Sequence, residues 1–154
     1  MAVRVQTEPF DIAAETAAIT DGRTDIGAVV TFTGVVRGTA DGTALSAMEL
    51  EHYPGMTETE LANVEAEAHA RFPLQASMIV HRVGVLQPGA PIVLVIAASA
   101  HRHAAFDGAA FLMDYLKTRA PFWKKETSAS GQATWVDARE TDDRAMARWG
   151  TDET

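Results

Sequence analysis

The apolar positions of this chain follow two periodicities, one typical of strands and one typical of helices. Alternating or continuous apolar runs, rich in β-branched residues, predict strands at residues 28–36, 45–52, 75–85, 92–98, 122–126 and 133–136. Apolar residues spaced three and four apart predict helices at residues 11–20, 57–72, 104–119 and 141–149. The run IVLVIAA at 92–98 has no polar position, which indicates a strand buried on both faces.

Local signals mark the ends of these elements. Asp11 stands where it can cap the first helix, and Thr57 with Glu60 has the spacing of a capping box for the second. Gly34 interrupts a β-branched run and predicts a bulge or a close backbone approach. The turn at Gly131 predicts that the last two strands pair with each other.

The order of the elements predicts the fold class. The short polar loop TADGT between strands 28–36 and 45–52 permits an antiparallel pair, whereas the later helices lie between strands. Hairpins and helical crossovers together favour an α+β fold. We expect one domain over residues 1–150 and a frayed tail at 151–154.

Composition excludes several classes of function. The 154 residues carry 13 basic and 21 acidic side chains, and a net charge of -8 disfavours non-specific binding to nucleic acid. The absence of cysteine rules out disulfides, thiolate zinc sites and a cysteine nucleophile. The first ten residues, MAVRVQTEPF, lack the apolar core of a signal peptide, so a cytoplasmic location is predicted.

One segment runs against this acidic balance. Residues 99–126 read SAHRHAAFDGAAFLMDYLKTRAPFWKKE, and positions 101–125 hold five Lys or Arg residues against two acidic ones. A local positive cluster in an acidic chain indicates a site for a small anion or an acidic partner.

Lys117 is the first candidate in this segment. On a helical wheel it lies within about 20° of Phe106, which suggests a place in the middle of the apolar stripe. Two interpretations stay open. Lys117 either extends its amine to solvent beside the helix C-terminus, or it is a partly desolvated amine usable as acid, base or nucleophile.

The other cations also allow two interpretations each. Lys124 and Lys125 point to opposite faces if they lie on a strand, so one of them can join Lys117, unless both simply protect an edge strand. His101 and Arg102 stand between a buried strand and a helix, where backbone N–H groups favour an anion, or they are surface residues. The histidines have no spacing typical of metal ligands, and no metal site is expected.

Several motifs in the same order carry a family resemblance. TFTGVVRG, LEHYPGMTE, HRVGVLQPG, SAHRHAAF and MDYLKTRAPFWKKE are similar to segments of the large, catalytic subunit of molybdopterin synthase, over residues 28–149. The resemblance implies an α/β hammerhead-type domain with an additional antiparallel β subdomain. It also implies a sulfurtransferase of molybdenum cofactor biosynthesis.

The resemblance further implies the reaction and the assembly. Sulfur passes from the C-terminal Gly-Gly thiocarboxylate of a small ubiquitin-like subunit to cyclic pyranopterin monophosphate (precursor Z), forming the dithiolene of molybdopterin. Two large subunits form a central homodimer with one small subunit at each end, a heterotetramer. No cofactor is expected, and neither nucleic acid nor a membrane is an expected partner.

By motif, the family's catalytic lysines correspond to Lys117 and Lys124. The implied substrate-binding residues are Arg37, His101, Arg102, Lys125 and Glu126. Val35 departs from the family pattern, in which a lysine often precedes the VR pair, and this removes a possible phosphate contact. Two rival hypotheses remain: a dimeric binding module for a phosphorylated ligand or acidic tail, and an inactive scaffold for a ubiquitin-like partner.

Overall fold

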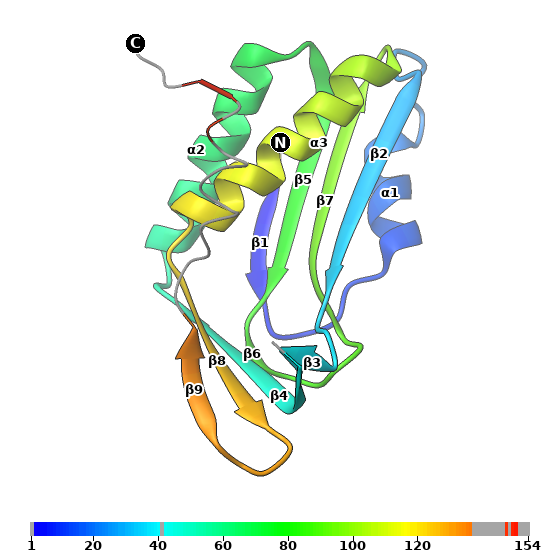
Figure 1. Cartoon of the computed structure of the whole chain (residues 1–154). Helices are drawn as coiled ribbons and strands as arrows, with labels where there is room; N and C mark the ends of the chain where they lie inside the picture. The colour runs from blue at the N-terminus through cyan, green and yellow to red at the C-terminus, as the bar shows by residue number, and fades with distance from the viewer. Residues whose placement is uncertain (1, 41, 137–146, 148, 151–154) are drawn as a thin grey trace.

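The computed structural model describes residues 2–40, 42–136, 147, 149 and 150. Two sheets meet at an angle, and three helices pack on the four-stranded one (Figure 1). The helices are α1 (Ile12–Thr20), α2 (Met56–Arg71) and α3 (Arg102–Arg119). The strands are β1 (Val3–Gln6), β2 (Ala28–Val35), β3 (Thr39–Ala40), β4 (Thr43–His52), β5 (Leu74–Arg82), β6 (Gly84–Leu86), β7 (Pro91–Ser99), β8 (Phe122–Ser128) and β9 (Ala133–Val136). The predicted α+β class is confirmed.

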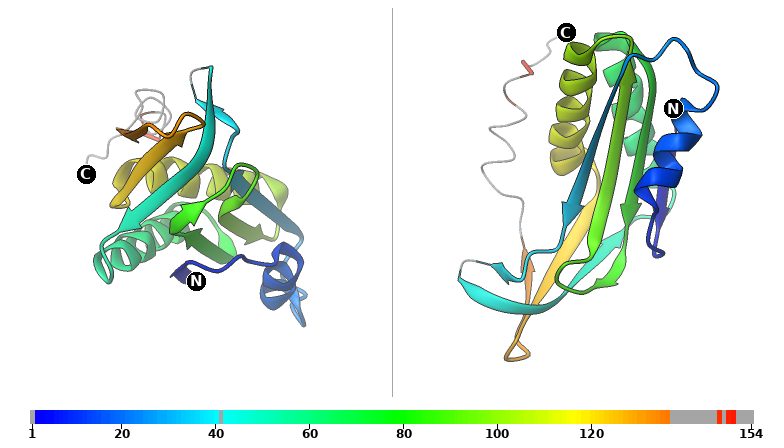
Figure 2. Two further views of the ribbon diagram at one scale, coloured as in Figure 1. Left: turned by 90° about the horizontal axis from the view of Figure 1, so that it is seen from below. Right: turned by 90° about the vertical axis from the view of Figure 1, so that its right-hand side faces the viewer.

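The first sheet has the strand order β1-β5-β7-β2 and is covered on both faces. Helices α2 and α3 lie on one face and α1 on the other, as the right-hand view of Figure 2 shows. Strand alternation sorts the core accordingly. Ile79, Val93 and Val95 pack towards α2 and α3, whereas their neighbours Met78, Val80, Leu94 and Ile96 form the cluster beneath α1. Burial on both faces explains the uninterrupted apolar run of β7.

The second sheet is antiparallel, with the order β3-β4-β8-β9 and with β6 also paired to β4. It stands below the first sheet in Figure 1. The predicted pair of strands 28–36 and 45–52 is wrong, because β2 pairs with β7 and β4 pairs with β8. The chain leaves the first sheet after Val36, and the predicted polar loop instead contains β3 and a short hairpin with β4. A small apolar cluster of Val36, Met48, Leu50, Val83 and Leu86 joins the two sheets.

Two helix starts differ from the sequence prediction. Helix α1 begins as expected, with the N–H of Ala14 donating to Asp11 Oδ1 at 3.0 Å. Helix α2 begins one residue earlier than Thr57, and its cap is Gly55, whose N–H donates to Glu58 Oε1 at 2.7 Å. The predicted capping box of Thr57 with Glu60 is therefore wrong. Helix α3 begins at residue 102 instead of 104.

Glycines explain two of the changes in strand direction. The predicted strand 75–85 is divided, because Gly84 has φ +92°, and the chain passes there from β5 in the first sheet to β6 in the second. Gly34 shows both predicted features. The β2–β7 register shifts beside it, and a Cβ there would lie 2.8 Å from Val93 Cγ1. The predicted pairing across Gly131 is confirmed in β8 and β9.

The predicted last helix at 141–149 lies largely outside the described residues, and the tail at 151–154 lies wholly outside them. Trp149 is described, and its ring packs edge-on against Phe72 and Phe111 while its Nε1–H donates to Asp114 at 2.6 Å. Within the described part of the chain, none of the helices is long and apolar enough to cross a membrane.

Candidate active site

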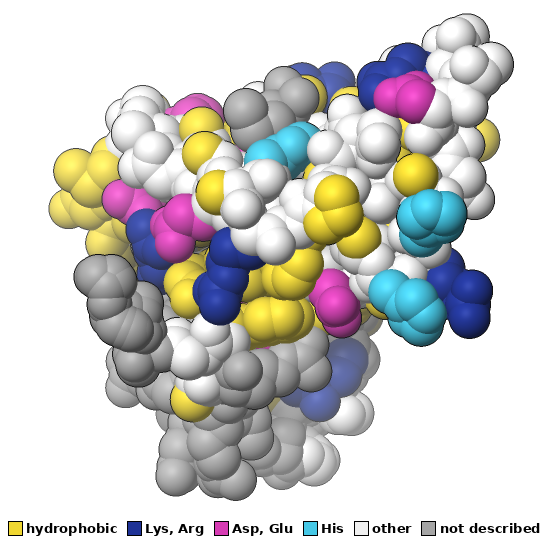
Figure 3. Space-filling model, turned by 90° about the horizontal axis from the view of Figure 1, so that it is seen from above, with side chains coloured by type: hydrophobic (Ala, Val, Ile, Leu, Met, Phe, Trp, Pro, Cys, Tyr) yellow, Lys and Arg dark blue, Asp and Glu magenta, His cyan; other side chains and the backbone are white. Residues whose placement is uncertain are grey.

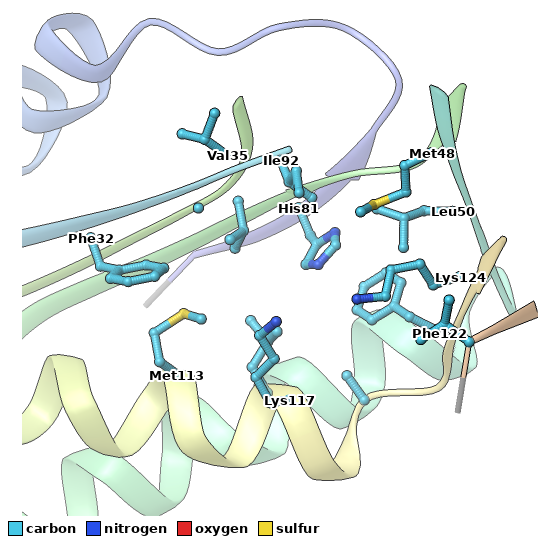
Figure 4. Close-up of a pocket in the computed structure, with 15 residues that line it drawn as sticks. Phe32, Val35, Met48, Leu50, His81, Ile92, Met113, Lys117, Phe122 and Lys124 are labelled. Atoms are coloured by element: carbon cyan, nitrogen blue, oxygen red, sulfur yellow. The ribbon is translucent and has the colours of Figure 1, made fainter. Parts of the chain in front are cut away.

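A cavity opens where the C-terminal end of α3 meets both sheets (Figure 4). Its volume is about 220 Å³, and we call it the main cavity. Most of its wall is apolar, and its ionisable side chains are a histidine and two lysines. The lining residues are Phe32, Gly34, Val35, Met48, Leu50, His81, Ile92, Val93, Met113, Leu116, Lys117, Ala120, Phe122, Lys124 and Val136.

Lys117 reaches the main cavity from the last turn of α3. The sequence prediction placed it in the middle of the apolar stripe, and this is wrong. Phe106, the reference of that stripe, is 60% exposed, and Lys117 is exposed too. The buried face of α3 is centred roughly 100° away from Phe106, at 3.6 residues per turn. Lys117 therefore lies at the rim of the buried face, with its amine directed into the cavity (Figure 4).

Lys124 enters the same cavity from β8, and the strand alternation separates it from Lys125. Leu50, Lys124 and Val136 form one cross-strand row, and all three line the main cavity. On the opposite face, Lys125 pairs with Glu49 at 3.4 Å and lies 5.4 Å from the centre of the Trp135 ring. The prediction that one of these lysines joins Lys117 is confirmed, and that lysine is Lys124. Lys125 lines neither cavity described here.

A buried threonine fixes the turn that joins the two lysines. Thr57 is fully buried at the start of α2. Its hydroxyl donates to the carbonyl of Pro121 at 3.2 Å and accepts from the N–H of Tyr53 at 3.1 Å. Pro121 lies between α3 and β8, and Tyr53 follows β4. The hydroxyl therefore ties the start of α2 to the end of β4 and to the turn between the helix of Lys117 and the strand of Lys124.

A second cavity of about 170 Å³ adjoins the first and shares both lysines with it. Arg37 and Glu126 are its further charged residues, so three cations and one carboxylate surround it. Glu126 is two residues beyond Lys124 on β8 and therefore faces the same side. Val35 lines both cavities. The local excess of positive charge suits a phosphate or a carboxylate.

His101 and Arg102 lie at the other end of α3. His101 is the N-cap, Arg102 is the first helical residue, and both are exposed. Figure 3 looks down on this end of the molecule, where histidine and basic side chains gather at one side. Fifteen residues separate Arg102 from Lys117, which is roughly 22 Å along the helix axis. One subunit thus brings together Arg37, Lys117, Lys124 and Glu126, but it does not bring His101 and Arg102 to them.

His81 was not predicted as a site residue, because the sequence pattern led us to consider it only as a possible metal ligand. His81 is 5% exposed, and its ring stacks on Phe122 with 3.9 Å between ring centres. Its Nδ1–H donates to the carbonyl of Arg82 at 2.8 Å. Burial, with a smaller contribution from the nearby charge of Lys117, lowers the pKa of His81 to about 4, although the hydrogen bond to Arg82 acts in the opposite direction. The available signal was a histidine directly after the apolar residues Met78, Ile79 and Val80 of a buried strand.

The arrangement suits a ligand with a flat or apolar part and an anionic part. The main cavity supplies aromatic and aliphatic walls, and the second cavity supplies cations. Among the described residues, no group of three or more His, Cys, Asp or Glu side chains is placed to hold a metal ion.

Comparison with known proteins gives matches over nearly the whole chain. A family model described as "MoaE protein" matches residues 5–119. The molybdopterin synthase catalytic subunit of Rhizobium meliloti is 60% identical over 148 residues, which cover 96% of this chain and 94% of that protein.

Solved structures agree with the sequence matches. The MoaE protein of Burkholderia ambifaria superimposes with a TM-score of 0.84 at 52% identity, covering 99% of this chain and 100% of that one. A complex of subunits 1 and 2 of molybdopterin-converting factor from Helicobacter pylori contains a chain of the same fold. Its TM-score is 0.70 at 18% identity, with 90% of each chain covered.

The family resemblance of the sequence motifs is thereby confirmed. The chain belongs to the MoaE family, the catalytic subunits of molybdopterin synthase, which are sulfurtransferases of molybdopterin biosynthesis.

Proposed function

We propose that the two cavities are the place where sulfur is transferred. The donor is the C-terminal thiocarboxylate of a small ubiquitin-like subunit, and the acceptor is cyclic pyranopterin monophosphate. The observation that carries this proposal is that Lys117 and Lys124, from different elements, line one cavity whose neighbour also holds Arg37.

The charge of the two reactants explains the need for several cations. The pterin carries a cyclic phosphate, and the donor ends in a thiocarboxylate, so two anions must approach each other. At 4 Å and an effective dielectric constant of 20, two like charges repel by about 4 kcal/mol. Lys117, Lys124 and Arg37 lie around the shared space and would offset this repulsion without any rearrangement of the chain.

Each cation has a distinct role in the proposal. The thiocarboxylate sulfur attacks a side-chain carbon of the pterin and displaces the oxygen bonded to it, which leaves the small subunit joined to the pterin through an acyl–sulfur bond. Water then cleaves that bond, so the sulfur stays on the pterin and the small subunit leaves as a carboxylate. Lys117 stands beside the reacting sulfur, where it stabilises charge or transfers a proton. Lys124 assists as the cyclic phosphate opens, and Arg37 binds the phosphate. Glu126 lines the same space, and in the proposal its carboxylate would help to orient these cations. Lys125, held by Glu49 on the opposite face, would act on the substrate only indirectly.

A second copy of the chain completes the site. His101 and Arg102 are too far from Lys117 to share a ligand within one subunit, so the proposal assigns them to the cavity of the partner. The edge strand β2 supports a homodimer, because Val29, Phe32 and Val35 are 36%, 41% and 48% exposed there. His101 and Arg102, contributed by the second copy, would help to keep a half-sulfurated intermediate bound between the two transfers.

The partner in this proposal is a small subunit bound at each end of the dimer, which makes a heterotetramer. The two-subunit complex from Helicobacter pylori supports it, as does the cationic wall that would receive a C-terminal tail. The cytoplasm is the proposed compartment, as predicted from the sequence.

Reconstitution tests the proposal. The purified chain is incubated with thiocarboxylated small subunit and cyclic pyranopterin monophosphate, and the dithiolene product is measured. The proposal requires product that depends on both reactants. Binding of both reactants without product would favour the binding-module hypothesis instead.

A further inference from the structure

His81 is fixed in the wall of the main cavity by contacts on two sides. Its ring stacks on Phe122, and its Nδ1–H donates a hydrogen bond to the carbonyl of Arg82. Together, these two contacts hold the ring in one orientation. In Figure 4 the imidazole points towards the space between Lys117 and Lys124.

The hydrogen bond to Arg82 determines which nitrogen carries the proton. A carbonyl oxygen only accepts, so Nδ1 is the protonated nitrogen, and in the neutral ring Nε2 carries a lone pair. No hydrogen bond of Nε2 is found within the described residues. Every fully buried side-chain nitrogen or oxygen among those residues has a hydrogen-bond partner, so Nε2 is not a fully buried atom. Nε2 is therefore reachable from the cavity and offers an acceptor to whatever enters it.

This acceptor differs in kind from the other ionisable groups in the cavity wall. Protonated Lys117 and Lys124 only donate hydrogen bonds. With a pKa of about 4, His81 is neutral at pH 7 and is too weak a base to take a proton from a ligand there. The neutral ring adds no charge to the cationic site. It supplies a fixed hydrogen-bond acceptor, which the protonated lysines do not.

We propose that Nε2 of His81 accepts a hydrogen bond from an N–H group of the pterin ring and so orients the heterocycle. This inference rests on the proposed function. The pterin ring presents amide and amino N–H donors, whereas the phosphate and the thiocarboxylate present acceptors. The two cavities thus bind different parts of the substrate. The cations bind the phosphate, and His81 binds an N–H group of the pterin ring.

A matched pair of variants tests this role. In His81→Gln the side-chain amide reaches the place of Nε2, while in His81→Asn it reaches only the place of Nδ1. Both lose the stacked ring. His81→Asn can keep the hydrogen bond to the Arg82 carbonyl but offers no acceptor at the place of Nε2, whereas His81→Gln offers that acceptor and loses the bond to Arg82. Calorimetric titration with cyclic pyranopterin monophosphate should show roughly tenfold weaker binding for His81→Asn and within about threefold of wild type for His81→Gln. Inorganic phosphate should bind all three proteins equally.

A measurement on the wild-type chain covers the case in which a variant fails to fold. In ¹⁵N NMR of the imidazole, addition of cyclic pyranopterin monophosphate should move the Nε2 resonance of His81 and leave Nδ1 nearly unchanged, and phosphate alone should move neither. Equal pterin affinity of the two variants and wild type, or an unmoved Nε2 resonance on pterin binding, overturns the inference. A wild-type chain that neither binds nor converts the pterin would instead overturn the proposed function, and this inference with it.

Discussion

Lys117 and Lys124 line the same cavity from two elements that run in different directions, the last turn of α3 and the strand β8. The turn at Pro121 between them is held by the buried hydroxyl of Thr57. The two amines therefore approach one ligand from two sides, which a pair of lysines on a single helix or strand could not do. This relationship is the structural basis of the proposed sulfur transfer.

The neighbouring lysines of β8 give a matched comparison. Lys124→Ala removes a cation from the cavity, and we expect product formation to fall by roughly a hundredfold or more. Lys125→Ala removes the same charge from the opposite face, where it pairs with Glu49, and should have a far smaller effect. Rates of dithiolene formation with saturating small subunit measure both. Equal losses in the two variants would mean that net charge, and not position, matters.

The hydroxyl of Thr57 should matter for stability and for rate. Thr57→Val keeps the shape but leaves the Pro121 carbonyl and the Tyr53 N–H without this partner, which should lower the free energy of unfolding by about 1–3 kcal/mol. Because the turn loosens, turnover should fall as well. Urea denaturation and turnover are measured together, with Thr57→Ser as the control that restores both. Wild-type turnover in Thr57→Val would show that the turn needs no such link.

Complementation between variants tests whether the dimer completes the site. Lys117→Ala and Arg102→Ala should each be strongly impaired alone. If Arg102 acts in the partner's cavity, a mixed dimer has one site with both residues intact, and random mixing should restore roughly a quarter of wild-type activity. The two variants are mixed, allowed to exchange subunits and assayed. If each site used its own Arg102, mixing would restore nothing.

The buried His81 predicts a loss of stability in acid. Its pKa in the folded chain is about 4, against 6.5 for an ordinary histidine, so between these values the unfolded chain binds a proton that the folded chain does not. The contribution of neutral His81 to the free energy of unfolding is therefore fully present above pH 6.5, and it is lost as the pH falls towards 4. From pH 7 to pH 5 this contribution is about 2 kcal/mol.

Urea denaturation at pH 7 and pH 5 measures that contribution, with His81→Gln as the comparison. Burial also lowers the pKa of His69 and raises that of Glu65, and these groups are common to both proteins. Their effects cancel in the difference between the two proteins. Wild type should lose about 2 kcal/mol more than the variant on acidification. Parallel losses would mean that His81 is not held neutral in the folded chain.

The sequence predicted individual elements better than their pairing. The period-two and period-3.6 patterns located β2, β7, α1 and the β8–β9 hairpin, because local propensity and burial agree there. The partner of β2 could not be predicted from its loop, since the chain changes sheets after Val36 and the pairing depends on β7, far along the chain. The division at Gly84 has the same cause, a backbone conformation that serves the junction of two sheets.

The site was predictable in part for equally physical reasons. Strand alternation separated Lys124 from Lys125 correctly. The helical wheel misplaced Lys117, because Phe106 is an exposed aromatic residue and a poor marker of the buried face. His81 escaped notice because its role depends on a cavity formed by α3, β8 and β4, which no local pattern reveals.

The most direct test of the account is turnover by Lys117→Ala with thiocarboxylated small subunit and cyclic pyranopterin monophosphate. Lys117 is exposed at the rim of the buried face, so the variant should fold with wild-type stability and still bind the small subunit. Product formation should fall below about 1% of wild type, because the charge beside the reacting sulfur is gone. Conversion at the wild-type rate by this variant would contradict the central claim.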